Sequence, residues 1–188
     1  MPLPAPAPRK LAHTRTISMA AYARDDGLWD LEGQLIDVKP YAFANKDRGG
    51  IEAGEPLHDM LVRLTIDNHF EIMAIDVAMD STPYSICPRI TPNFQELVGH
   101  RIGPGWRRKL KEIAGGVKGC THVLELLGTM ATVAYQAAYS SEKVTGKKRV
   151  KDPSATAKFM VNTCHAYRAD GPVVQEYFPD HYTGDRKS

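Results

Sequence analysis

One helical segment constrains the fold of this chain more than any other, because it combines an apolar circumference with a narrow polar stripe. The stripe follows Gly119-Cys120-Thr121, and its members recur at alternating spacings of three and four, on one face of an α-helix: His122, Glu125, Thr129, Thr132 and Gln136. A helix that is apolar at its other positions is usually buried. The stripe therefore meets either a strip of solvent or a polar cavity. We favour the cavity, because the stripe contains no Lys or Arg.

The length and composition of the chain predict one domain preceded by an arm. The 188 residues are enough for a substantial core, and no shift in composition divides them. Residues 1–8 alternate Pro with small side chains, a pattern that does not form a packed element. We expect a flexible Pro/Ala-rich arm over residues 1–14 and a single domain over residues 15–188.

The charge distribution argues against nucleic acid or a membrane as the partner. The formal net charge is only +2, and the one basic run, residues 147–151, lies among Gly, Thr, Asp and Pro, as expected of a solvated loop. No stretch is apolar enough to cross a bilayer, and the N-terminus lacks the apolar region of a secretory signal. We expect a cytoplasmic enzyme or binding protein.

Alternating polarity predicts strands in the first half of the chain. Within residues 28–41, Trp29, Leu31 and Leu35 share one face, and the same register brings Asp37 and Lys39 onto it. Residues 57–66 and 70–79 form a hairpin in which His58 shares a face with Met60 and the aliphatic residues that follow. His58 is either a core histidine bonded to a backbone carbonyl or a functional group.

The sequence after residue 90 predicts mostly helices. Helices are predicted over residues 91–98, 106–114, 120–141 and 155–167, a long polar loop over 42–56, and a last strand over 173–178. Strands followed by helices, without a βαβ rhythm, are typical of an α+β domain. We therefore expect a curved antiparallel sheet covered on one face by helices, including one long central apolar helix.

The residues offer chemistry that needs no cofactor. The common nucleotide-binding, hydrolase and zinc-peptidase motifs are absent from the sequence. If the long helix packs on the sheet face that carries His58, that face and the helix share a pocket suited to general acid/base chemistry. Its candidate residues are Asp37, Lys39, His58, Cys120 at the helix start, His122, Glu125 and Tyr84, although Tyr84 is equally explained as a packing residue.

Three cysteines leave a metal site open as an alternative. Cys87, Cys120 and Cys164 are far apart and lack C-x-x-C spacing, so they do not indicate a disulfide framework. Cys120 and His122, with Cys87 or Cys164, form a conceivable zinc ligand set. Ordinary buried cysteines explain the pattern more simply, because the paired short spacings of structural zinc sites are missing.

Four separated segments resemble one bacterial family. They are residues 24–33 (RDDGLWDLEG), 57–60 (LHDM), 83–87 (PYSIC) and 119–127 (GCTHVLELL). In this order they resemble the family catalogued as domain of unknown function 2889, and the similarity extends from about Arg15 to Tyr182.

The resemblance also implies an activity. Some members resemble γ-formaldehyde lyases, which release formaldehyde from the hydroxymethyl group of lignin-derived aromatic dimers of the phenylcoumaran type and leave a stilbene. That activity implies a small aromatic substrate and no metal or redox cofactor. The roles implied are His58 or His122 as base, Glu125 or Asp37 orienting it, Tyr84, Lys39 or the helix N-terminus stabilising a phenolate, and Trp29, Met60 and Met130 as apolar walls.

A non-catalytic role is the other alternative. A small-molecule-binding protein or a homo-oligomeric accessory protein would use the polar stripe as a hydrogen-bonding lining or as a subunit contact. The distance between His58 and His122 tests the shared pocket, because placement on opposite sides of the domain would rule that pocket out.

Overall fold

The computed structural model describes residues 3–139, 142–146, 156–157 and 160–185. The chain divides into two compact units, Met1–Thr145 and Gly146–Ser188. The first unit holds the sheet and its covering helices, and the second holds short helices and turns. Each unit is described by itself.

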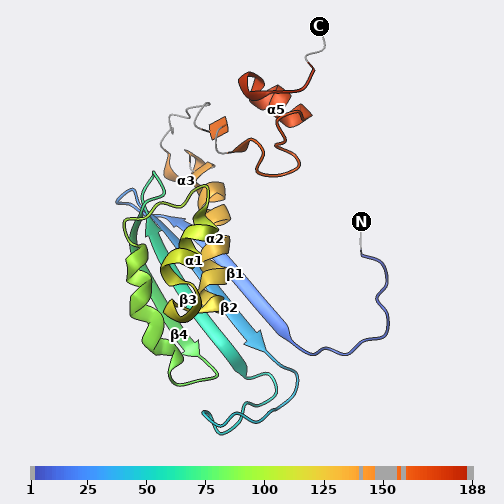
Figure 1. Ribbon diagram of the computed structural model, residues 1–188, viewed down its shortest axis with the longest axis vertical. Helices are drawn as coiled ribbons and strands as arrows, with labels where there is room; N and C mark the ends of the chain where they lie inside the picture. The colour runs from blue at the N-terminus through green and yellow to red at the C-terminus, as the bar shows by residue number, and fades with distance from the viewer. Residues whose placement is uncertain (1–2, 140–141, 147–155, 158–159, 186–188) are drawn as a thin grey trace. The chain divides into compact units, whose positions relative to one another are not determined.

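A four-stranded antiparallel sheet forms the first unit (Figure 1). Its strands are β1 (Thr14–Ala23), β2 (Trp29–Val38), β3 (Pro56–Ile66) and β4 (Ile72–Ser81). The spatial order follows the chain, β1-β2-β3-β4, so each strand pairs with its neighbour in sequence. The predicted hairpin of residues 57–66 and 70–79 is present as the antiparallel pair β3 and β4.

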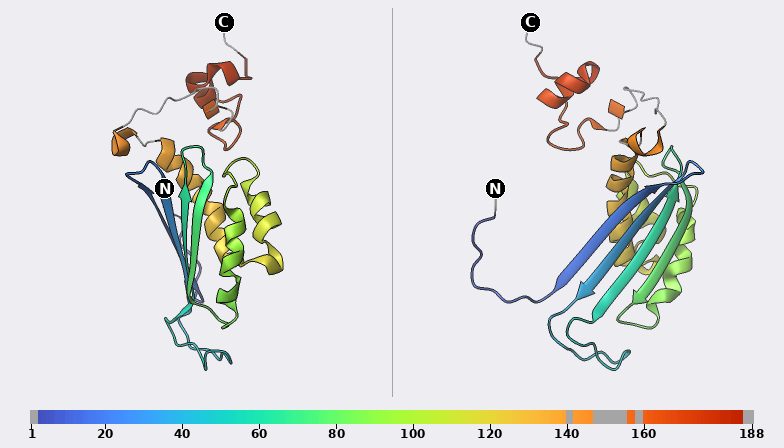
Figure 2. Two further views of the ribbon diagram at one scale, coloured as in Figure 1. Left: turned by 90° about the vertical axis from the view of Figure 1, so that its left-hand side faces the viewer. Right: turned by 180° about the vertical axis from the view of Figure 1, so that it is seen from behind.

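Among the described residues of the first unit, the helices cover one face of this sheet and not the other (Figure 2). They are η1 (Cys87–Leu97), α1 (Trp106–Ala114), η2 (Gly116–Lys118), α2 (Thr121–Tyr139) and the short α3 (Glu142–Thr145). α2 packs across β1, β2 and β3, whereas η1 lies along β4. The predicted α+β class, with helices on one face of an antiparallel sheet, is confirmed.

The core lies between the sheet and these helices. Odd positions of β2 and even positions of β3 point inward, so Leu31, Leu35, Met60 and Leu64 are fully buried. From the helices, Leu126, Leu127 and Met130 meet them. The period-two assignment of both strands is confirmed, and it also places Asp37 and His58 on the inner face.

Two features of the first unit differ from expectation. β1 was not predicted, because its Thr-, Arg- and Ser-containing start is exposed and pairs with β2 on one side only. The helix predicted over residues 91–98 is instead a 3₁₀ helix that begins at Cys87. Proline is the reason, since Pro88 stands at its start and Pro92 within it, where α-helical hydrogen bonds would be lost.

The second unit contains α5 (Pro172–Tyr177) and η3 (Pro179–His181). The predicted strand over residues 173–178 is wrong, because Gly171 and Pro172 start a helix there, and Pro suits the first helical position. Residues 161–167 form turns and bends. The rest of the predicted 155–167 helix falls partly outside the described residues, and the basic run at 147–151 falls wholly outside them. Within the described part of the chain, no helix combines the length and apolarity needed to span a membrane.

Candidate active site

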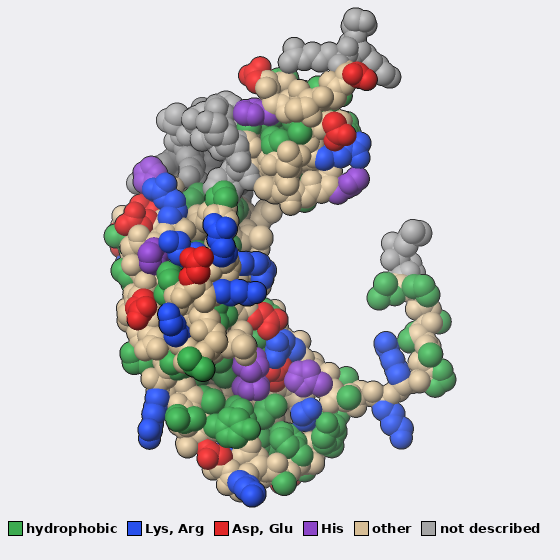
Figure 3. Space-filling view, in the orientation of Figure 1, with side chains coloured by type: hydrophobic (Ala, Val, Ile, Leu, Met, Phe, Trp, Pro, Cys, Tyr) green, Lys and Arg blue, Asp and Glu red, His purple; other side chains and the backbone are tan. Residues whose placement is uncertain are grey.

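A buried carboxylate is the centre of the candidate site. Asp37 is the second-last residue of β2 and points into the helix-covered face, where only 1% of it is exposed. Among the described residues, it is the one charged residue that is buried. Histidine side chains lie beside acidic and basic side chains on this side of the protein (Figure 3). A buried carboxylate needs close partners, since the interior does not solvate its charge.

Arg15 supplies the first of these partners. It stands opposite Asp37 in the β1–β2 register, and its Nε and terminal nitrogen donate to the two carboxylate oxygens at 2.8 Å each. Its other terminal nitrogen donates to Glu125 Oε2 at 2.6 Å. Burial raises the pKa of Asp37, but Arg15 and then His58 outweigh that effect and hold it at about 2. Asp37 is therefore ionised at neutral pH.

His58 lies directly opposite Asp37 in the β2–β3 register. Its Nδ1 is 2.9 Å from Asp37 Oδ2. Burial lowers the pKa of His58 below its ordinary value, while the Asp37 carboxylate opposes that shift. Because a carboxylate only accepts, Nδ1 carries the proton of the neutral ring, which leaves the Nε2 lone pair free.

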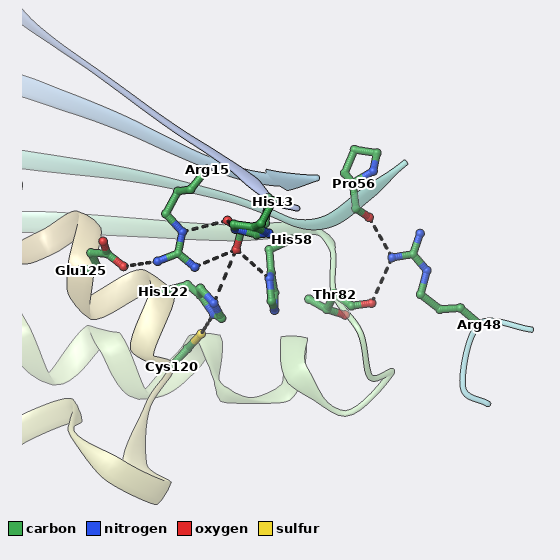
Figure 4. A network of polar contacts seen from close by, with 10 residues as sticks. His13, Arg15, Arg48, Pro56, His58, Thr82, Cys120, His122 and Glu125 are labelled. Carbon is green, nitrogen blue, oxygen red and sulfur yellow. Dashed lines mark hydrogen bonds and ion pairs between the residues drawn. The ribbon is translucent and has the colours of Figure 1, made fainter. Parts of the chain in front are cut away.

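His122 stacks on His58 from the first turn of α2. The ring centroids are 3.8 Å apart and the rings are inclined by 34°. His122 Nε2 lies 3.7 Å from Asp37 Oδ2, and its Nδ1 lies 3.7 Å from Cys120 Sγ. Burial, followed by the neighbouring His58, lowers the pKa of His122. Figure 4 shows Arg15, His58 and His122 converging on the same carboxylate.

His13 completes the contacts of Asp37. Its Nε2 lies 3.0 Å from Asp37 Oδ1, and its side chain comes from the residue before β1. We call Asp37, Arg15, His58, His122, Glu125 and His13 the Asp37 cluster. With the histidines neutral, this cluster contains two carboxylates and one guanidinium, so its formal charge is −1. It accommodates one further positive charge.

The Asp37 cluster also has a geometry that metal ions use. One ligand atom from each of Asp37, His58 and His122 lies within 4.8 Å of the others. Among the described residues, no further group of three such side chains is this close. Two imidazoles and a carboxylate suit Zn²⁺ and similar divalent ions. Of the predicted Cys-based ligand set within the first unit, Cys120 approaches His122 with its Sγ 3.7 Å from Nδ1, but neither Cys120 nor Cys87 belongs to the group of three.

The predicted site residues separate into two groups. Asp37, His58, Cys120, His122 and Glu125 come together, as the shared-pocket hypothesis requires. The other predicted residues do not join this group. Trp29 lies at the opposite end of β2, where its Nε1 donates to Asn68 Oδ1 at 3.2 Å, and Met60 and Met130 lie in the core. Lys39 has its Nζ 3.3 Å from the Tyr41 hydroxyl, and Tyr84 is 58% exposed.

The polar stripe of α2 is only partly directed at the site. His122 reaches Asp37, and Glu125 reaches Arg15 while remaining 43% exposed. Farther along, the Thr129 and Thr132 hydroxyls donate to carbonyls of their own helix at 3.0 and 2.8 Å. Only the first turn of the stripe is therefore directed at the Asp37 cluster, and Thr132 and Gln136 farther along are exposed. A hollow of about 540 Å³ lies elsewhere, on the outer face of the sheet between Tyr22 and Asp76.

Arg15 and His13 are the members of the Asp37 cluster that sequence reasoning missed. Both belong to the segment that was assigned to the arm or left without a strand. A weak signal was present, because Arg15 precedes Ile17 and Met19 at period two, the pattern of an inward face. The pattern was hard to recognise because six of the ten residues of this edge strand are exposed.

The fold and the Asp37 cluster together define an α+β protein with a buried carboxylate–histidine centre beneath the start of one helix. Comparison with known families places it more narrowly. The chain belongs to the family described as "Protein of unknown function (DUF2889)", which matches residues 13–136. This range is shorter than the resemblance noted from the sequence, yet it contains the whole Asp37 cluster. Searches of curated proteins and of solved structures gave no match.

Proposed function

We propose that this protein is a cofactor-independent carbon–carbon lyase that releases formaldehyde from a lignin-derived aromatic dimer and leaves a stilbene. The observation that carries the proposal is the pairing of His58 Nδ1 with the buried Asp37 carboxylate, 2.9 Å away. This pairing fixes one tautomer of the imidazole and increases its basicity. A positioned base of this kind contributes about 10² to 10⁴ in rate.

The proposed reaction begins at the hydroxyl of the hydroxymethyl group. His58 Nε2 takes its proton, the oxygen electrons form the C=O bond of formaldehyde, and the Cβ–Cγ bond breaks. The electron pair released from that bond forms the Cα=Cβ bond of the stilbene while the Cα–O bond breaks. The departing oxygen leaves as a phenolate and recovers the proton from the imidazolium. No electrons are gained or lost overall.

The Asp37 cluster is matched to this proton transfer by its charge. A proton that arrives on His58 brings the formal charge of the cluster from −1 to zero, so the intermediate state is not penalised by a buried excess charge. Arg15 keeps Asp37 ionised throughout, and Glu125 balances Arg15. The N–H groups at the start of α2, the helix that carries His122, are the donors we assign to the departing phenolate.

Exposed apolar side chains on the loops at the Asp37 end of the sheet support an aromatic substrate. Tyr41, Tyr84 and Ile86 are 47%, 58% and 64% exposed. They belong to the loops that adjoin the ends of β2, β3 and β4 nearest Asp37 and His58. The loops are joined because an Arg48 terminal nitrogen donates to the Pro56 carbonyl at 2.9 Å and to the Thr82 carbonyl at 3.5 Å (Figure 4). Exposed aromatic and aliphatic side chains on loops connected by hydrogen bonds can pack against an aryl ring of a substrate.

Turnover of a phenylcoumaran with a free hydroxymethyl group tests the reaction. We expect formaldehyde and stilbene to appear in equal amounts, without an added metal or redox cofactor. The matched control is the same dimer with a methyl group in place of the hydroxymethyl group, which has no proton for the base to remove in this reaction. Formaldehyde without stilbene, or no turnover of the hydroxymethyl substrate at all, would contradict the proposal.

A further inference from the structure

We infer that Asp37, His58 and His122 also form a binding site for a divalent transition-metal ion of the Zn²⁺ kind, and that the bound ion switches the proposed base off. The binding rests on the geometry of the three side chains alone. Only the switching rests on the proposed function.

The distances between the ligand atoms fit a tetrahedral ion. Asp37 Oδ2 lies 2.9 Å from His58 Nδ1 and 3.7 Å from His122 Nε2. Bonds of the length that Zn²⁺ makes to nitrogen and oxygen place two ligands of a tetrahedron roughly 3.3 Å apart. The observed separations lie on either side of that value. All three ligand atoms lie within 4.8 Å of one another, so side-chain rotations are what a bound ion would require of this group, with the fourth position left for water.

The surroundings complete such a site. Each carboxylate oxygen has two lone pairs, so Asp37 Oδ2 can retain the hydrogen bond from Arg15 while its second lone pair meets the ion. Ligating carboxylates usually have hydrogen-bonding partners of this kind, which orient them. The Arg15 guanidinium would repel a cation, but Glu125 compensates its charge at 2.6 Å. The formal charge of −1 on the Asp37 cluster then favours a cation.

Metal binding at these atoms removes the free lone pair that the lyase proposal needs. In the base, His58 Nδ1 carries the proton and Nε2 is free. A neutral imidazole whose Nδ1 binds an ion carries its proton on Nε2 instead, so it no longer accepts the proton of a hydroxyl group. The ion also replaces the hydrogen bond between His58 and Asp37. The same three side chains therefore have a metal-free state that acts as a base and a metal-bound state that does not.

Titration of the purified chain with Zn²⁺ tests the site. Protein made without a histidine tag and treated with a chelator should bind one ion in calorimetry, and Co²⁺ bound at the same site should give the visible absorption of a tetrahedral complex. His122→Gln keeps a polar side chain but loses one ligand, and we expect its affinity for Zn²⁺ to fall by at least about 10-fold. His69→Ala, in the exposed turn between β3 and β4, is the matched control and should bind like the wild type.

The result that overturns the site is the absence of saturable one-to-one binding, or equal affinity in the wild type and a folded His122→Gln variant. His58→Gln gives a second, independent variant with the same expectation. Circular dichroism of each variant separates lost binding from lost folding.

The switch is tested with the turnover assay. We expect Zn²⁺ to abolish formaldehyde release and a chelator to restore it. An inactive chelator-treated enzyme that recovers with Zn²⁺ would overturn the switch and make the ion a cofactor. If no metal state turns the substrate over, the lyase proposal fails and the switch fails with it, while the calorimetric result still decides the site.

Discussion

Two arginine–carboxylate pairs with similar N···O distances lie on opposite faces of the same sheet. On the inner face, Arg15 meets Asp37 at 2.8 Å, and on the outer face Arg63 meets Glu32 at 2.7 Å. The arginines are 32% and 53% exposed, but the carboxylates differ far more, with Asp37 1% and Glu32 40% exposed. The pairs therefore differ mainly in the burial of the carboxylate and in its further partners, since Asp37 also contacts His13 and His58.

Burial changes what each pair does. Water can replace either partner of the outer pair, and salt screens it, so exposed pairs contribute about 0–1 kcal/mol. Water cannot take the place of the protein partners of the buried Asp37 carboxylate, so the carboxylate requires them. The hydrogen bonds in turn fix the orientation of the arginine and histidine side chains. The inner pair therefore holds the Asp37 cluster together, while the outer pair lies on an exposed surface.

Removing the carboxylates should give the largest contrast. Asp37→Ala leaves Arg15 and two half-buried histidines without their common partner, and we expect it to lower the free energy of unfolding by about 3 kcal/mol. Glu32→Ala should cost less than about 1 kcal/mol. Urea denaturation of both variants measures the two losses. Losses of equal size would contradict the assignment of different roles to the two faces.

Removing the arginines should give a smaller contrast. Arg15→Met leaves Asp37 with hydrogen bonds from His13 and His58, so the expected loss is about 2 kcal/mol rather than the full cost of an unpaired buried charge. Arg63→Met should change the unfolding free energy by about 0.5 kcal/mol or less. High salt should reduce the effect of the outer substitution more than that of the inner one, and thermal unfolding in low and high salt checks this.

Acid should weaken the inner pair selectively. The pKa of Asp37 is about 2 in the folded chain and 3.8 ordinarily, so it binds fewer protons folded than unfolded. Its contribution to stability is present above about pH 4 and is lost as the pH falls toward 2. In chelator-treated protein, the stability difference between wild type and Asp37→Asn should therefore shrink across this range. A difference that stays constant from pH 6 to pH 2 would contradict the lowered pKa.

The smallest expected effect concerns packing on the two faces. A Cβ atom at Gly33 would lie 3.2 Å from Met130 Cε and 3.5 Å from Leu126 Cδ2 on the inner face. Gly33→Ala should destabilise by about 1 kcal/mol, because the flexible Met130 end gives way only in part. Ala78→Ser, on the exposed outer face, should stay within about 0.5 kcal/mol of wild type. Equal melting temperatures for the two variants would show that the inner face is not tightly packed there.

Periodicity predicted the part of the fold that burial enforces. β2 alternates strictly and β3 alternates through its middle because one face of each is buried, and that alternation predicts the face on which Asp37 and His58 lie. The helical spacing of α2 did the same for His122. An edge strand shows a weaker polarity alternation because much of it is exposed, so β1 was missed. The 3₁₀ form of η1 depends on the backbone hydrogen bonds that its two prolines remove, and a polarity pattern does not report those bonds.

The site was predictable residue by residue but not as a network. The sequence indicated which faces carry His58, Asp37 and His122, yet cross-strand register decides that Arg15, Asp37 and His58 stand opposite one another. Register depends on pairing across the whole sheet, which one strand does not specify. The same limit applies to Trp29, whose predicted place at the site was incompatible with its position at the far end of β2.

The rate of formaldehyde release by three histidine variants tests the central claim most directly. If the Asp37 cluster is the reactive centre, His58→Gln should reduce kcat by about 10² to 10⁴ and His122→Gln should also reduce it, while His69→Ala keeps the wild-type rate. Full activity in both His58→Gln and His122→Gln would contradict the account.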